Sequence, residues 1–136
     1  PGPLAPRVRR RFLMQRKKIL LVDDSTTVLL MERMILAKSQ YDVLEARDGQ
    51  EGLEKARAEQ PDLIFMDVVM PRLGGFEAVE RLRQDDATRA IPVIMVTTRG
   101  ELESVETGYA AGCTDYVTKP INGLELLSKV RSCLGQ

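Results

Sequence analysis

The sequence predicts an α/β protein built on a doubly wound, five-stranded parallel sheet with helices on both faces. Four short runs rich in Val, Ile, Leu and Met lie along the chain, each bounded by turn signals, as is typical of strands buried on both faces. Segments with helical spacing separate these runs, and such alternation favours parallel strands joined by right-handed crossovers. A chain of 136 residues can form one domain with a substantial core.

Turn and capping residues set the element boundaries in the first half of the chain. Ser25 follows the first apolar run and is typical of a helix N-cap. Asp48-Gly49 indicates a turn before the next helix, and Pro61 ends that helix. The predicted elements are a strand at 18–23, a helix to about Lys38, a strand at Tyr41–Ala46, a helix to about Glu59 and a strand at Leu63–Met66.

The second half continues the alternation, but glycines weaken one of its helices. Gly100, Gly108 and Gly112 flank or interrupt the helix expected near Glu101–Ala111, and a Gly inside a helix costs about 1 kcal/mol relative to Ala. A marginally stable helix is a suitable element for a switch. The predicted elements are a helix near Phe76–Arg83, a strand at Ile91–Val96, a helix near Glu101–Ala111, a strand at Tyr116–Thr118 and a helix over roughly Gly123–Leu134.

Charge is distributed unevenly although the net charge is zero. Residues 1–18 carry seven basic residues and no acidic one, so the remainder carries 13 basic and 20 acidic residues. We expect residues 1–16 to form a flexible basic arm: an expression remnant, a native tail, or a contact for an acidic partner or anionic lipid. The acidic body argues against nucleic acid as the main ligand, and no apolar run approaches the ~20 residues of a membrane helix.

Two residue types restrict the chemistry further. The chain has no His, which excludes His-based general acid–base catalysis and His-ligated metal sites. Cys113 and Cys133 are far apart and lack the spacing of a metal or redox motif, so we interpret both as small apolar core residues. This use of cysteine indicates a reducing, cytoplasmic location.

Chemically active side chains follow four of the predicted strands. Asp23 and Asp24 close the first, Asp67 the third, Thr97 the fourth and Lys119 the fifth. In an open parallel sheet, ligands bind outside the carboxyl ends of the strands. Three neighbouring carboxylates repel one another, and a divalent cation relieves that repulsion while Lys supplies a further positive charge. This arrangement suits an acidic side chain that receives a phosphoryl group.

The same residues resemble the receiver domain of response regulators in two-component signal transduction, such as the chemotaxis regulators. A single motif would be weak evidence, but all of them occur in order and at the intervals of the family, over residues 17–134. The resemblance implies a flavodoxin-like fold with strand order 2-1-3-4-5, and it makes residues 17–136 the receiver domain. The motifs are VDDS after the first strand, D-x-x-M-P at Asp67–Pro71 with Gly75 beyond, TT at Thr97-Thr98 and KP at Lys119-Pro120.

The resemblance assigns the phosphoacceptor role to Asp67. Its carboxylate is expected to take the phosphoryl group from a phosphohistidine, and since this chain lacks His the donor has to be a histidine kinase or phosphotransfer protein. Asp23, Asp24, Asp67 and the backbone carbonyl of Val69 are expected to hold Mg²⁺, for which Mn²⁺ can substitute. Such a domain assists its own phosphorylation and dephosphorylation but is not otherwise an enzyme.

Other residues receive supporting roles from the resemblance. Lys119 is expected to pair with Asp67 and then with the phosphate, and the Lys119-Pro120 bond to be cis. Thr97 is expected to donate its hydroxyl to the phosphate, and Tyr116 to rotate inward in response. Thr98 occupies a place where the family prefers a small residue.

The same resemblance places the output surface on residues 101–111, 116–118 and 123–134. A downstream protein or a fused output domain is the expected partner there, with no membrane contact and no direct nucleic acid contact. We expect a monomer or a weak, phosphorylation-dependent dimer. Val69 and Arg99 flank the site and are expected to give a slowly dephosphorylating state.

Two other functions would also fit an α/β fold with an aspartate at a strand end. A phosphatase of the haloacid dehalogenase type needs a D-x-D motif, but Ser25 and Thr26 stand two residues after Asp23 and Asp24, and there is no cap domain. A receiver fold that has lost phosphorylation and only docks partners would not need all five site residues. Whether the chain is a stand-alone regulator or part of a larger protein stays open.

Overall fold

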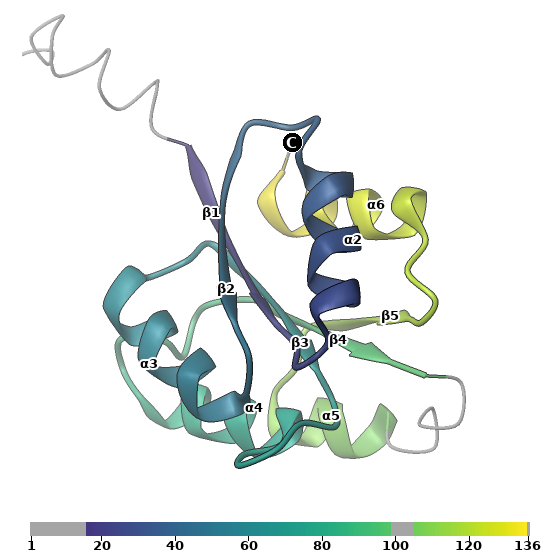
Figure 1. Cartoon of the computed structure of the whole chain (residues 1–136). Helices are drawn as coiled ribbons and strands as arrows, with labels where there is room; N and C mark the ends of the chain where they lie inside the picture. The colour runs from purple at the N-terminus through teal and green to yellow at the C-terminus, as the bar shows by residue number, and fades with distance from the viewer. Residues whose placement is uncertain (1–15, 99–104, 136) are drawn as a thin grey trace, which may run out of the picture.

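The structure is a computed structural model that describes residues 16–98 and 105–135. Five parallel strands form one sheet in the order β2-β1-β3-β4-β5, which confirms the predicted order (Figure 1). The expectations for the basic arm, apart from Arg16, and for residues 99–104 lie outside the described residues. The strands are β1 Lys17–Val22, β2 Tyr41–Ala46, β3 Leu63–Asp67, β4 Val93–Thr97 and β5 Asp115–Thr118.

Helices cover both faces of the sheet, as predicted. In Figure 1, α2 and α6 lie on one face, whereas α3, α4 and α5 lie on the other, and contacts join neighbouring helices within each set. None of the helices in the described part of the chain is long and apolar enough to cross a membrane. The helices are α2 Thr26–Leu36, α3 Gly49–Glu59, α4 Gly75–Gln84, α5 Val105–Ala111 and α6 Gly123–Leu134.

Side-chain caps begin three of the helices. The Ser25 hydroxyl accepts a hydrogen bond from the Val28 amide at 3.3 Å, which confirms the predicted N-cap of α2. Asp48, predicted only as part of a turn, caps α3 in the same way, and Asn122 caps α6. These oxygens satisfy amides that have no partner within the helix.

Side chains alternate between two apolar clusters along the central strands. Leu20 and Met66 join the cluster under α3, α4 and α5, which we call the α3–α5 layer. Leu21 and Phe65 join the cluster under α2 and α6, which we call the α2–α6 layer. Successive side chains of a strand point to opposite faces, so a sheet covered on both faces needs the continuous apolar runs seen in the sequence.

Strand boundaries differ by one or two residues from the predicted ones, and Pro92 explains the largest difference. β4 begins at Val93 rather than Ile91. Pro has no amide hydrogen to donate to a sheet, although the Pro92 carbonyl still accepts from the Ile64 amide at 3.0 Å. All five predicted strands nevertheless form.

Candidate functional site

The carboxyl ends of β1 and β3 bring three aspartates together. Each of Asp23, Asp24 and Asp67 offers a carboxylate oxygen, and these oxygens lie within 4.8 Å of one another. Asp23 and Asp67 are buried, whereas Asp24 is exposed. The chain leaves β1 toward β2 on one side and later returns to β3 on the other, which makes this edge the point where ligands bind in doubly wound sheets.

Lys119 joins the cluster from the end of β5. Its ammonium nitrogen lies 3.1 Å from Asp67 Oδ1 and 3.3 Å from Asp23 Oδ2. Its backbone amide donates to the Thr97 carbonyl at 2.7 Å, and the Lys119-Pro120 peptide bond is cis. The structure therefore brings together the four charged residues that the motifs predicted.

Burial dominates the electrostatics of the site. It raises the pKa of Asp67 to about 6, with a further rise from the Asp23 charge and an opposing effect of Lys119. Burial also raises the pKa of Asp23, against the hydrogen bond from the Ser25 amide and the charge of Lys119. For Lys119, burial lowers the pKa, but the charges of Asp23 and Asp67 outweigh it and raise the pKa overall. One ammonium does not neutralise three carboxylates.

The donor set fits a hard divalent cation. All three side chains offer carboxylate oxygens, the ligands that Mg²⁺ prefers. Asp23 Oδ2 is buried, and the Lys119 ammonium 3.3 Å away from it is shared with Asp67. A cation held by the cluster would give these crowded carboxylate oxygens a further partner.

The loop after β3 fixes the backbone of Asp67. The Gly75 amide donates to the Val68 carbonyl at 2.8 Å, so α4 begins directly over the end of β3. A Cβ on Gly75 would overlap the Asp67 carbonyl oxygen and lie 2.9 Å from Met95 Cε, so only Gly fits there. Val69 stands exposed in this loop, two residues after Asp67.

Thr97 and Tyr116 lie on the strands beyond Asp67. Thr97 is buried at the end of β4, opposite Thr118 of β5, and its hydroxyl donates to the Thr98 carbonyl at 3.3 Å. Tyr116 is half-buried, and its ring meets that of Tyr109 edge-on with 5.3 Å between centroids. Burial, followed by a hydrogen bond with Cys113, raises the pKa of the Tyr116 hydroxyl.

Sequence reasoning missed a buried glutamate near the site. Glu32 of α2 is only 1% exposed, and its Oε2 has no hydrogen-bond partner among the described residues. Burial, and then the negative charge of Asp23, raises its pKa to about 8. The available signal was its spacing, because Glu32 follows Leu29 by three residues and precedes Leu36 by four, and both leucines are buried.

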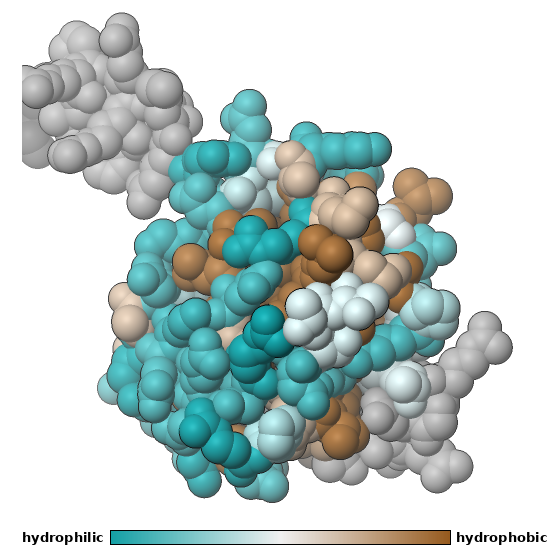
Figure 2. Space-filling model, viewed as in Figure 1, coloured by the Kyte–Doolittle hydropathy of each residue, from teal (hydrophilic) through white to brown (hydrophobic). Residues whose placement is uncertain are grey.

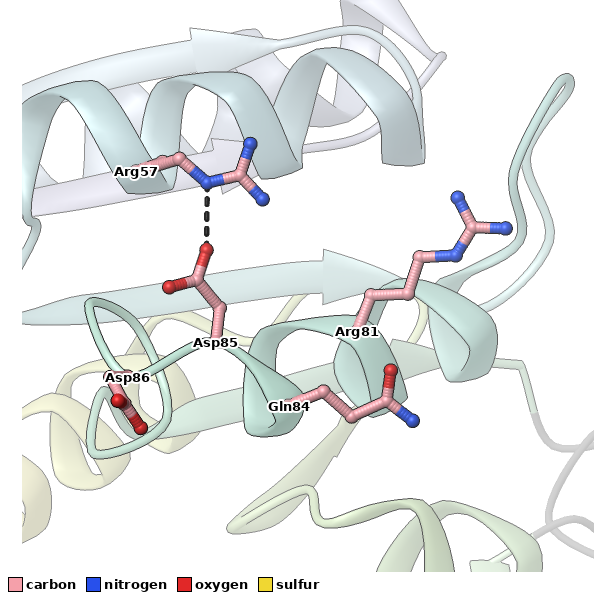
Figure 3. A pocket seen from close by; sticks show the side chains of 5 residues that line it. All are labelled: Arg57, Arg81, Gln84, Asp85 and Asp86. Atoms are coloured by element: carbon pink, nitrogen blue, oxygen red, sulfur yellow. Dashed lines mark hydrogen bonds and ion pairs between the residues drawn. The ribbon is translucent and has the colours of Figure 1, made fainter.

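An open pocket lies away from the carboxylates, near the C-terminal ends of α3 and α4 (Figure 3). Helices that follow parallel strands run back across the sheet, so these ends lie at the edge opposite the carboxyl ends of the strands. Within the pocket, Arg57 pairs with Asp85 at 2.7 Å. The pocket therefore has no part in the chemistry of the aspartates. Its lining residues are Arg57, Arg81, Gln84, Asp85 and Asp86.

Comparison with known proteins decides the family. The family model of the response regulator receiver domain matches residues 19–131. The chain belongs to this family. Receiver domains serve phosphorylation-dependent signalling, interact with histidine kinases and output domains, and are not conventional enzymes.

Relatives of this receiver domain differ in length. Protein PilH of Pseudomonas aeruginosa is 42% identical over 100 residues, which cover 74% of this chain and 83% of PilH. The transcriptional regulator RpaA of Synechocystis is 43% identical over 94 residues, which cover 69% of this chain but only 39% of RpaA. The chain thus spans less than half the length of some relatives and most of the length of others.

Solved structures share the fold. A response regulator from Chloroflexus aurantiacus superposes with a TM-score of 0.85 at 32% identity, covering 90% of this chain and all of that one. The receiver domain of the Pseudomonas aeruginosa sensor kinase PA1611 superposes with a TM-score of 0.82 at 28% identity, covering 90% of this chain and all of that one. That structure has a magnesium ion in its active-site cleft. These likenesses confirm the predicted flavodoxin-like receiver fold.

Proposed function

We propose that this receiver domain accepts a phosphoryl group on Asp67 from the phosphohistidine of a histidine kinase or phosphotransfer protein. The contact that best supports this is Lys119 Nζ, held 3.1 Å from Asp67 Oδ1 beside two further aspartates. An Asp67 oxygen attacks phosphorus, a P–O bond forms, and the P–N bond of the donor breaks. Its electron pair returns to the imidazole nitrogen.

The neighbours of Asp67 provide charge balance in this reaction. Mg²⁺ or Mn²⁺, held by Asp23, Asp24, Asp67 and the Val69 carbonyl, would offset the negative charge of the phosphoryl oxygens. Lys119 stays beside the acceptor oxygen and stabilises the same charge from the protein side. The Thr97 hydroxyl leaves the Thr98 carbonyl and donates to a phosphate oxygen.

Two exposed apolar surfaces suit protein partners. Leu30, Met31 and Met34 are exposed on α2, directly after the aspartates of β1, and we assign this surface to the phosphodonor. Tyr109 and Leu124 are exposed on the face of α5, β5 and α6, which we assign to the downstream protein or output domain. Figure 2 shows apolar side chains gathered around α2 and α6. Exposed apolar side chains that gather on one surface favour contact with another protein.

Acetyl phosphate tests the central step without any partner. With Mg²⁺ present, intact mass spectrometry is expected to show one added phosphoryl group on the wild type and none on Asp67→Asn. Chelation of the cation is expected to abolish the product. Asp86→Asn is the matched control, because Asp86 is exposed and lies in the pocket at the opposite edge. Equal phosphorylation of wild type and Asp67→Asn would refute the assignment.

The lifetime of the phosphorylated state rests on Val69 and Arg99 in this proposal. Val69 is exposed two residues after Asp67 and cannot orient an attacking water by hydrogen bonding. Substituting Val69→Asn together with Arg99→Glu is expected to speed the loss of phosphate after the donor is removed, followed by mass. Unchanged or slower decay would contradict this role.

A further inference from the structure

The Tyr116 hydroxyl occupies space that a side chain on Gly108 would need. A Cβ on Gly108 would overlap the Tyr116 hydroxyl oxygen and lie 2.8 Å from Tyr116 Cζ. It would also lie 2.8 Å from Cε1 of Phe76 on α4. Gly108 itself is buried. The missing side chain therefore forms a slot between α4 and α5 that the end of the Tyr116 ring fills.

Polar contacts hold the hydroxyl in this slot. Tyr116 shares a hydrogen bond with the Gly108 backbone and another with the Cys113 side chain, in the turn after α5. The ring also meets Tyr109 edge-on, a favourable aromatic geometry. Tyr116 on β5 thus contacts Gly108, Tyr109 and Cys113. These three residues lie in one short segment that covers the end of α5 and the turn after it.

Gly108 lowers the stability of α5, and the docked Tyr116 ring offsets this loss. It lies inside α5, for which the structure describes Val105–Ala111, and Gly in a helix costs about 1 kcal/mol relative to Ala. If the Tyr116 ring did not fill the slot, Ala at this position would therefore stabilise α5 more than Gly does. The weakness of the helix and the fit of the ring are consequences of the same missing Cβ.

We propose that Gly108 is the positioning residue for Tyr116: its missing side chain admits the ring and thereby couples β5 to α5. Lys119 follows Tyr116 by three residues along the same strand end, so a movement at the phosphorylation site reaches α5 through the docked ring. The coupling to phosphate rests on the proposed function. The docking itself does not.

Replacing Gly108→Ala tests the docking in the absence of phosphate. The added methyl group is expected to evict the ring, so the aromatic NMR signals of Tyr116 move toward those of an exposed tyrosine. The hydroxyl pKa is expected to fall toward its ordinary value. Gly123→Ala is the control, because its nearest neighbour, Ile35 Cγ1, lies at 3.6 Å and leaves room for a methyl group. Unchanged Tyr116 signals in Gly108→Ala would overturn the proposal.

A double-mutant comparison keeps the proposal testable if eviction destabilises the fold. Gly108→Ala is expected to lower Tm in the presence of Tyr116 and to lower it much less in a Tyr116→Ala background, where only the contact with Phe76 remains. The same loss of Tm in both backgrounds would show that the ring is not what the methyl group displaces.

Phosphorylation with acetyl phosphate then tests the coupling. Gly108→Ala is expected to be phosphorylated at a rate within twofold of wild type, while the amide shifts that phosphate induces in α5 are lost. Retained α5 shifts would overturn the coupling. If the wild type takes no phosphate, the proposed function fails, whereas the phosphate-free measurements on Tyr116 stand or fall separately.

Discussion

The two helical layers differ in how closely their helices pack. In the α3–α5 layer, glycines bring helices into close contact with backbone and side chains, and a Cβ at Gly49, Gly75 or Gly108 would overlap a neighbour. In the α2–α6 layer, the glycine Gly123 has room for a methyl group, yet a carboxyl group, Glu32, is buried there without a hydrogen bond for its Oε2. The first layer is closely fitted, whereas the second carries an uncompensated polar group.

Their outer surfaces differ as well. Four of the exposed large apolar side chains in the described part of the chain, Leu30, Met31, Met34 and Leu124, belong to α2 and α6. Close internal fit transmits small displacements, because packed interiors resist deformation. An exposed apolar surface instead favours contact with another protein. The close fit of the α3–α5 layer suits it to transmit a conformational change, and the exposed apolar side chains of α2 suit it to contact another protein.

The largest expected effect comes from filling a glycine contact in the α3–α5 layer. Gly75→Ala forces a methyl group onto the Asp67 carbonyl and is expected to destabilise the fold by about 3 kcal/mol. Gly123→Ala, the control in the other layer, is expected to change stability by no more than about 1 kcal/mol. Urea unfolding measures both. Equal effects would remove the contrast between the layers.

Removing the buried carboxyl is expected to stabilise the α2–α6 layer. Glu32→Leu should gain about 4 kcal/mol at pH 8, because a buried group without a partner is replaced by an apolar one. The folded pKa is about 8 and the ordinary value 4.5, so the unfolded chain loses this proton first as pH rises. Wild-type stability therefore falls relative to Glu32→Leu between about pH 4.5 and 8, and the two converge below that range.

Unfolding of both proteins at several pH values checks this prediction. Glu32→Gln, which cannot ionise but keeps the shape, is the matched control and is expected to lose the same pH dependence. A constant stability difference from pH 4 to 8 would mean that Glu32 is not held neutral.

Polar substitutions on α2 are expected to affect recognition but not stability. Leu30→Gln with Met34→Gln should change the free energy of unfolding by less than about 0.5 kcal/mol, because both side chains are exposed. Phosphoryl transfer from a cognate kinase should slow at least tenfold, while phosphorylation by acetyl phosphate stays unchanged. Glu54→Gln on the exposed surface of α3 is the control. Unaltered transfer from the kinase would exclude this surface as the docking site.

The smallest effect is expected at the ion pair in the pocket of Figure 3. Arg57→Ala removes the pair with Asp85 but is expected to cost less than about 1 kcal/mol, because the arginine is largely exposed. Urea unfolding measures this loss of stability. A loss well above that value would contradict the prediction and show that exposed ion pairs stabilise the α3–α5 layer.

Local patterns were sufficient for the strands, the Ser25 cap and the convergence of Asp23, Asp67 and Lys119. They were sufficient because buried parallel strands need continuous apolar runs and their ends lie at one edge. The strand order required the family resemblance. Contacts between distant segments could not be predicted from the residues alone. Gly108 suggested a weak helix, but nothing near it in sequence indicates that a ring from the next strand fills its place.

Glu32 shows a different limit of sequence reasoning. Its helical spacing places it among buried leucines, but a charged residue is normally assigned to the solvent face, since glutamates are almost never fully buried. Only the packed structure shows that this carboxyl is buried.

Sheet order also bears on the sequence of events as the chain folds. Strands β2, β1 and β3 are neighbours and are complete by Asp67, so all three carboxylates lie in the first half of the chain. Lys119, which pairs with two of them, is supplied by β5 at the far edge of the sheet. If the first three strands assemble first, the carboxylates meet before their ammonium partner arrives. Like charges in proximity oppose compaction, so divalent cations are expected to accelerate refolding at low ionic strength.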